Sequence, residues 1–118
     1  MRYVCLVYGE EDRLHALAPQ EMAELDAGSI AYDRQLEESG HLIIAQALQT
    51  VTKSKKVRRR KGKVIVTDGP FAETKEQLLG FFIIEADTLA RALELAGGAP
   101  LAGFGTIEVR QVYKIPGS

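Results

Sequence analysis

The sequence predicts an α+β fold of the ferredoxin-like type, with an antiparallel sheet, two helices on one face of the sheet and an extra hairpin strand. The first observation behind this prediction is the order of the patterned segments, which is strand, helix, strand, hairpin, strand, helix, strand. The second is size, since 118 residues with 46% hydrophobic side chains can build one layered core. We therefore predict a single domain over residues 1–118.

Two different periodicities predict the first strand and the first helix. The segment RYVCLVY, residues 2–8, is β-branched, aromatic and too short for a helix, which indicates a buried strand ending at Gly9. After the acidic connection EEDRLHALAP, Pro19 suits the first turn of a helix, Gly28 indicates close packing within it, and Gly40 ends it with a left-handed cap. One apolar stripe runs along this helix through Met22, Leu25, Ser29, Tyr32 and Leu36.

The middle of the chain predicts a strand and then a basic hairpin. Residues 41–48, which are mostly apolar, predict the second strand, and residues 50–60 predict the third. The Lys61-Gly62 turn then leads into another strand over residues 63–67.

The last third of the chain predicts a strand, a helix and a final strand. Residues 78–85 are apolar up to the final Glu85, which is typical of a central strand. Asp87 suits the N-cap of the second helix, which Gly97-Gly98 stops. Residues 105–113 alternate in character and form the last strand. The second helix carries its apolar face on Leu89, Ala92, Leu93 and Ala96.

The two predicted helices cover only one face of the sheet. The chain has no further segment with which to bury the apolar side chains of the other face. A second subunit is the simplest cover, so we expect a homodimer.

The near-neutral total charge conceals a polarised distribution. Residues 53–63 hold eight of the fifteen basic residues, whereas residues 1–38 hold nine acidic residues and three arginines. A basic cluster can bind phosphate, but here no aromatic residue interleaves with it and no recognition helix is attached. We therefore expect no nucleic-acid binding, and assign the cations to protecting an exposed edge strand, with the acidic first helix as a possible counterpart.

The connection TDGPFAETKE, residues 67–76, is longer and more varied than a hairpin needs. Asp68-Gly69 favours a tight turn, Pro70 stiffens the exit, and Thr74 to Gln77 match a capping box that predicts a short helical turn. Open amides at such a turn favour an anion. As the groups that would orient a polar ligand we select Asp68, Phe71, Glu73, Lys75 and Glu76; the alternative is a solvated loop, with Phe71 in the core.

Three further residues are weighed as functional. His41 could act as a general base if it faced the same cleft as Asp68, since imidazole titrates near neutrality, or it could be a surface histidine. Tyr8 could place its hydroxyl at the mouth of the cleft or simply plug one end of the sheet. His15 is expected to be solvated, and two histidines so far apart predict neither a metal site nor a cofactor.

Cysteine use and hydropathy bear on the compartment. Cys5 is the only cysteine, which excludes an internal disulfide and indicates a small buried hydrophobic residue. No stretch has the roughly 18 apolar residues of a membrane span, and the N-terminus does not resemble a signal peptide. We therefore expect a cytoplasmic protein without a membrane partner.

TDGPFAETKEQLLGFF resembles the signature of the DGPF family, a branch of the YCII-related proteins named for its Asp-Gly-Pro-Phe motif. The opening MRYVCLVYGEE, the segments ALAPQEMAEL and SGHLIIAQALQ, and the closing IEVRQV resemble family segments in the same order. The resemblance implies a dimeric α+β barrel of ferredoxin-like subunits. Family members are often encoded beside extracytoplasmic-function sigma factors, which implies a regulatory or sensing task.

The resemblance does not supply an activity. Relatives are proposed to use a His and Asp pair in a cleft, and one related group performs dehydrochlorination, with the histidine in the first helix. Here the first helix, PQEMAELDAGSIAYDRQLEESG, contains no histidine.

Three functions therefore stay open. The first is a dimer that binds a polar or anionic small molecule near the DGPF loop. The second is a lyase or isomerase in which Asp68 or Glu73 removes a proton and Lys75 stabilises the developing anion. The third is a protein-interaction module whose basic hairpin docks on an acidic partner.

Overall fold

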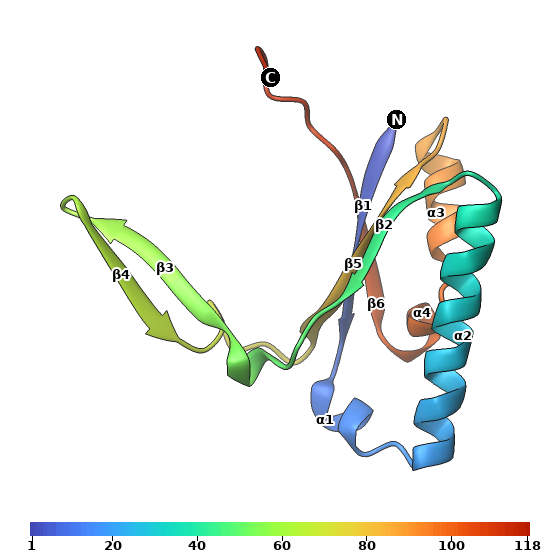
Figure 1. Cartoon of the computed structure of the whole chain (residues 1–118), viewed down its shortest axis with the longest axis horizontal. Helices are drawn as coiled ribbons and strands as arrows, with labels where there is room; N and C mark the ends of the chain where they lie inside the picture. Colours follow the sequence, from blue (N-terminus) through green and yellow to red (C-terminus); the bar gives the residue numbers. More distant parts are fainter.

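The computed structural model describes residues 1–118 and is built around a four-stranded antiparallel sheet (Figure 1). The strand order β2-β5-β1-β6 places the first and the second-last strands at the centre. This order and the helix positions are consistent with the ferredoxin-like plan that the sequence predicts. The strands are β1 (Arg2–Gly9), β2 (Leu42–Ala47), β5 (Gln77–Glu85) and β6 (Thr106–Gln111).

The helices lie on one face of this sheet, as predicted (Figure 1). The long α2 (Pro19–Glu38) and α3 (Leu89–Ala96) pack there together with a short helix α4 (Pro100–Phe104), and a second short helix α1 (Glu11–His15) follows β1. The sequence did not predict α1 and α4, because five residues are too few to show helical periodicity.

Register explains why the core lies on the helical side of the sheet. Cys5 pairs with Phe82 on one side and with Val109 on the other, so all three side chains share one face. In the core under the helices, the rings of Tyr32 and Phe82 pack edge to face, with their centroids 5.8 Å apart. The fully or nearly buried hydrophobic residues include Tyr3, Cys5, Val7, Leu36, Phe82, Ile84, Ala92 and Ala96.

Two predicted details of the helices concern packing and capping. At Gly28 a Cβ would lie 3.4 Å from Cγ of Pro100, which is an ordinary van der Waals distance, so α2 packs against α4 there without requiring a glycine. The N-cap of α3 is Thr88 and not Asp87 as predicted, because Thr88 directly precedes the helix and its hydroxyl accepts the N–H of Arg91 at 3.1 Å.

The other face of the sheet has no helix over it; we call it the open face. Leu6 and Phe81 are direct cross-strand neighbours there, as are Val4 and Ile83. Ile44 of the edge strand β2 extends the same apolar surface, opposite Ile83. The polar end of the face is β6, where Glu108 pairs with Leu6.

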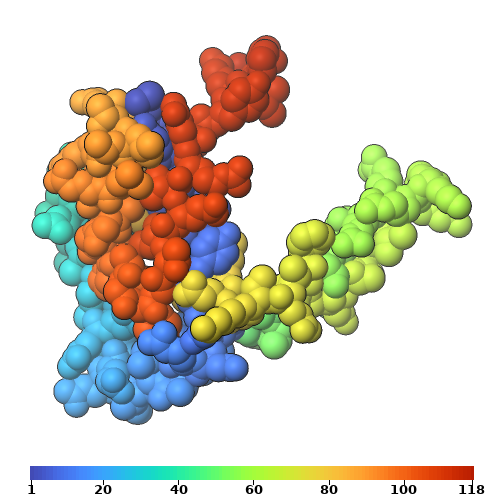
Figure 2. All heavy atoms as spheres, turned by 180° about the vertical axis from the view of Figure 1, so that it is seen from behind, coloured from blue at the N-terminus to red at the C-terminus, as the bar shows by residue number.

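The basic hairpin differs from the prediction. It is not a strand of the main sheet but a separate two-stranded sheet of β3 (Lys55–Arg60) and β4 (Lys63–Asp68), which we call the arm. A 3-10 turn η1 (Val51–Lys53), capped by Thr50, turns the chain away from β2 before β3 begins. Figure 2 shows the arm standing clear of the body, joined to it through its base.

The arm's own turn is well specified by sequence. Lys61 and Gly62 both have positive φ, 52° and 77°, which is the backbone of the tight hairpin turn that fits the twist of two strands. The hairpin prediction is therefore confirmed, and its attachment to the sheet is what sequence pattern missed.

Candidate functional site

The DGPF loop, residues 68–76, connects the arm back to the body. Gly69 adopts φ 87°, and its N–H donates to the carbonyl of Ser54 at 2.8 Å, which closes the base of the arm. The predicted helical turn at Thr74 is wrong. The side-chain amide of Gln77 donates to the carbonyl of Thr74 at 2.6 Å instead of accepting its N–H, because the Gln77 oxygen is already occupied and residue 77 begins β5.

A groove lies between this loop, the base of the arm and the end of β1. Its volume is about 840 Å³, and it opens on the side where Figure 2 shows the hollow between arm and body. Tyr8 and Phe71, both selected from sequence, line it, together with Leu48 and Leu78. Three basic residues of the arm and its base also line the groove: Lys53, Lys55 and Lys56.

The charges of the groove are unequal. Among its lining residues only Glu76 is acidic, and its carboxylate accepts a hydrogen bond from the Thr106 hydroxyl at 2.9 Å. Lys55 forms an ion pair with Asp68 across the arm, whereas Lys53 and Lys56 make no ion pair. The groove therefore carries excess positive charge beside an apolar wall.

The other loop residues selected from sequence do not line the groove. Asp68 is exposed at the end of β4, and its carboxylate is engaged by Lys55. Glu73 is exposed as well. The Lys75 side chain is 88% exposed, and its Nζ lies 3.8 Å from the Glu10 carboxylate. The structure therefore brings Tyr8 and Phe71 together and leaves Asp68, Glu73 and Lys75 on the outer surface of the loop.

Phe71 is the contact between loop and arm. Its side chain is largely exposed, and the guanidinium carbon of Arg58 lies 5.7 Å from its ring centroid. Of the two alternatives for Phe71, the core position does not hold, because the residue is 82% exposed.

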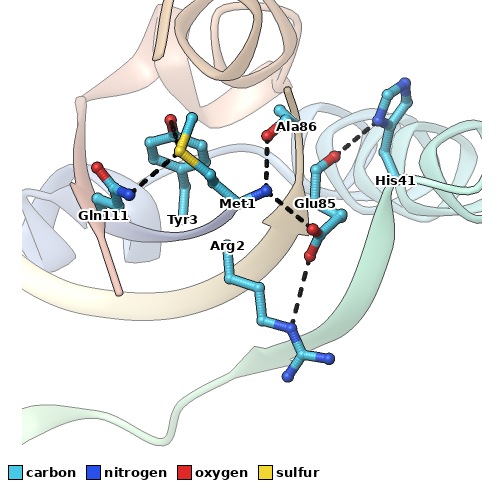
Figure 3. Close-up of polar contacts among 7 residues, drawn as sticks. All are labelled: Met1, Arg2, Tyr3, His41, Glu85, Ala86 and Gln111. Atoms are coloured by element: carbon cyan, nitrogen blue, oxygen red, sulfur yellow. Dashed lines mark hydrogen bonds and ion pairs between the residues drawn. The ribbon is translucent and has the colours of Figure 1, made fainter. Parts of the chain in front are cut away.

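His41 directly precedes β2, whereas the arm follows the other end of that strand. Its Nδ1 is 2.8 Å from the carbonyl oxygen of Glu85, as Figure 3 shows. The structure does not bring His41 and Asp68 into one cleft, so the condition under which His41 would act as a base with Asp68 is not met.

The neighbourhood of His41 is an ion-pair cluster at the N-terminus (Figure 3). The ammonium group of Met1 donates to the Glu85 carboxylate at 2.9 Å, and Nε of Arg2 lies 3.5 Å from the same group. The hydrogen bond from the Met1 ammonium, with the charge of Arg2, lowers the pKa of the Glu85 carboxyl.

Sequence reasoning missed Glu11, which forms hydrogen bonds with two residues that line the groove, Val51 and Gln77. It is a buried carboxylate, 7% exposed, that accepts the N–H of Val51 at 2.9 Å. Its own N–H donates to the side-chain oxygen of Gln77 at 2.8 Å. Glu11 thereby ties together both chain segments at the base of the arm. An acidic residue in a run of acidic residues carries no sequence signal for such a role.

Two smaller cavities beneath α2 were also missed. One, of about 140 Å³, lies against Ser29, Tyr32 and Asp33, and the other, of about 240 Å³, reaches His15 and Asp26. Burial raises the pKa of the Asp33 carboxyl. The hydroxyl of Tyr32 donates to the Leu95 carbonyl at 2.6 Å, which fixes α2 to α3.

Two further properties of the structure concern metal binding and membrane crossing. The structure has no group of three or more His, Cys, Asp or Glu side chains placed to hold a metal ion. No helix combines the length and the apolar character that a membrane crossing needs.

Comparisons with known proteins cover nearly the whole chain. The family model described as YCII-related domain matches residues 1–116. An uncharacterised protein of Rhizobium meliloti (strain 1021) is 38% identical over 112 residues, which is 93% of this chain and 90% of that protein. The chain belongs to the YCII-related domain family.

Proposed function

We propose that this protein is a homodimer that binds a small anionic molecule in the groove beside the DGPF loop. The observation that carries the proposal is the lining of the groove, where Lys53 and Lys56 stand without carboxylate partners next to Tyr8 and Phe71. An uncompensated pair of ammonium groups attracts an anion and supplies charge-assisted hydrogen bonds.

The rest of the lining favours a ligand with an apolar part. Leu48, Leu78 and Pro70 provide the apolar wall. The Tyr8 hydroxyl makes no hydrogen bond within the chain and is free to meet a polar group. The volume of about 840 Å³ falls in the usual range for small-molecule sites, about 300–1,000 Å³.

Binding is favoured over the lyase or isomerase alternative. A general base needs to reach its substrate from a site that closes around it, and Asp68 is exposed and paired with Lys55. Glu73 is also on the outer surface of the loop. The sensing or regulatory task that the DGPF resemblance implies fits a protein that binds a small molecule without transforming it, and we include it in the proposal.

The test is a thermal-shift screen with small carboxylates and phosphates, since a ligand that binds the folded state raises the melting temperature. For the strongest ligand, Lys53→Met should weaken binding by about tenfold or more, the loss of one charge-assisted hydrogen bond. Lys75→Met is the control, because Lys75 is also an exposed lysine and does not line the groove.

Equal loss of affinity in the two lysine variants would move the site from the groove to the outer surface of the loop. Unchanged affinity in Lys53→Met would refute the groove as the binding site.

A further inference from the structure

The arm is too exposed to be stable by itself. Every arm residue except Lys56 is exposed, and the apolar side chains Val57, Val64, Ile65 and Val66 are each at least 44% exposed. An isolated two-stranded hairpin is marginally stable at best in water, and needs a third strand or a packed surface to persist. The exposed apolar side chains of the arm are therefore typical of an element that packs against another surface in the functional protein.

The amount of uncovered surface matches a second protein chain. The accessible area of this chain is 8443 Å², whereas a compact monomer of its mass exposes about 6,300 Å². The radius of gyration of 16.3 Å likewise exceeds the roughly 13–14 Å of a compact domain of this length. The excess of about 2,100 Å² per chain is the amount that each partner buries in a large, stable dimer.

The charges identify what covers the arm. No acidic residue occurs between Lys53 and Thr67, and within the arm only Lys55 has an ion-pair partner. The complementary surface is α2, which has six acidic residues and one basic residue, Arg34. None of the six is in an ion pair: Glu21, Glu24, Asp26, Asp33, Glu37 and Glu38.

The arm cannot meet the α2 of its own chain. Figure 1 shows the arm on one side of the main sheet and α2 on the other. Two unpaired surfaces of opposite charge, on opposite sides of one molecule, fit each other when the contact is made between two copies related by a two-fold axis.

We propose that the arm clasps a second copy of this chain, laying its basic strands on the partner's acidic α2 while the partner's arm does the same in return. This inference rests on the homodimer of the proposed function. A six-residue strand is about 20 Å long and facing sheets pack about 10 Å apart, so an arm leaving one sheet passes the partner's sheet and reaches its helical layer.

The experiment is a charge exchange between two variants of the full chain. The arm variant carries Arg58→Glu, Arg59→Glu and Arg60→Glu, and the helix variant carries Glu24→Lys, Asp26→Lys and Glu37→Lys. All six side chains are exposed, and circular dichroism of each variant checks that it is folded. Each variant alone sets like charges against each other in both clasps, so its dimer dissociation constant should rise at least about tenfold.

Mixing the two variants restores both clasps, because each negative arm then meets a positive helix and each positive arm a negative helix. Native mass spectrometry of isotopically labelled chains should show heterodimers in clear excess over both homodimers. The control variant, with lysine at positions 58, 59 and 60, keeps the charge and should dimerise as the unmodified chain does.

Four results would overturn the inference. Statistical mixing with unchanged affinity would remove the clasp and leave the dimer of the proposed function intact. A helix variant that dimerises normally, while the arm variant does not, would place the arm elsewhere on the partner. RNA or DNA binding at physiological salt that the arm variant loses, with its dimer unchanged, would assign the arm to nucleic acid. An unmodified chain that stays monomeric at micromolar concentration would refute the homodimer itself, and the clasp with it.

Discussion

At the scale of single residues, burial beneath α2 changes the acid–base behaviour of side chains that the sequence leaves ordinary. Cys5 is fully buried in the core, and burial raises the pKa of its thiol to about 12. This confirms the sequence prediction of a small buried hydrophobic residue, since such a thiol stays protonated and unreactive. Asp33 shows the same effect more weakly at the edge of a cavity.

Asp33→Asn should stabilise the protein at neutral pH. The folded-state pKa of Asp33 is raised above its ordinary 3.8, so the folded protein prefers the neutral carboxyl, and the stability that this preference contributes is fully present below pH 3.8. The contribution is lost as the pH rises through the folded pKa, and asparagine avoids the loss. Because Asp33 is only part-buried and solvent screens its charge, we expect a gain well below about 1 kcal/mol in the free energy of unfolding at pH 7 and none near pH 3.

Thermal melts of the two proteins at both pH values measure this difference. Asp26→Asn is the control, because Asp26 lies on the same helix and is exposed. An equal gain in both variants would trace the effect to the charge of the helix and not to burial.

At the scale of elements, the short helix α1 is the anchor of the arm. Its first residue, Glu11, holds the N–H of Val51 with its carboxylate and the side chain of Gln77 with its backbone. Because Val51 begins η1 and Gln77 begins β5, one residue fixes both segments through which the arm is attached.

Glu11→Ala should loosen the base of the arm without unfolding the sheet. The N–H of Val51 loses its partner in a part-buried position, at a cost of about 1–3 kcal/mol. Hydrogen exchange should accelerate at Val51 and along β3 and β4, while β1 and β5 keep their protection.

Glu11→Gln keeps a side-chain oxygen for Val51 and serves as the control, with near-normal exchange in the arm. If β1 exchanged as fast as the arm in Glu11→Ala, the contact would support the whole fold and the role as an anchor would be lost.

The sequence predicted those elements whose position in the fold leaves a local pattern of apolar or turn-forming residues. Alternation and apolar runs located the four sheet strands, the stripe of α2 located the long helix, and Lys61-Gly62 located the hairpin turn. The direction in which the hairpin leaves the sheet was not predictable. It depends on the short turn η1 and on the hydrogen bond from Gly69 to Ser54, which joins the two ends of the hairpin.

The sequence singled out some of the residues that line the candidate groove. Tyr8 and Phe71 stood out by position and by type, and both line the groove. Lys53 and Lys56 were seen only as members of a basic run, since nothing local distinguishes a cation that faces a groove from one that faces water. Glu11 depends on contacts to residues 40 and 66 positions away, which no spacing rule reports.

At the scale of the whole molecule, the open face is an apolar surface that no helix covers. The apolar pairs Leu6 with Phe81 and Val4 with Ile83 lie at its centre, and no helix covers them. In the proposed dimer this face packs against its copy, and the dimeric barrel implied by the DGPF resemblance would follow from that packing.

If the open face is the interface of the proposed dimer, Phe81→Glu should convert that dimer into a monomer. It places an unpaired carboxylate at the centre of the proposed apolar interface, and we expect at least about a hundredfold weaker association. Light scattering at low micromolar concentration measures the change. Leu93→Glu is the control, since Leu93 is an exposed apolar residue on the helical side and should leave assembly unaltered.

A folded Phe81→Glu protein with the mass of a dimer would exclude the open face as the interface. A dimer lost equally in Leu93→Glu would point to general destabilisation.

The central position of β1 also sets the order in which the fold can be completed during synthesis. β1 is the first strand to be made, yet its two neighbours in the sheet are β5 and β6, which begin at residues 77 and 106. During synthesis β1 is thus an apolar strand with both edges unpaired until β5 is made, and with one edge unpaired until β6 follows. Unpaired edges of this kind are where incomplete chains associate wrongly. The arm, whose strands are separated by a two-residue turn, can close long before the sheet that bears it exists.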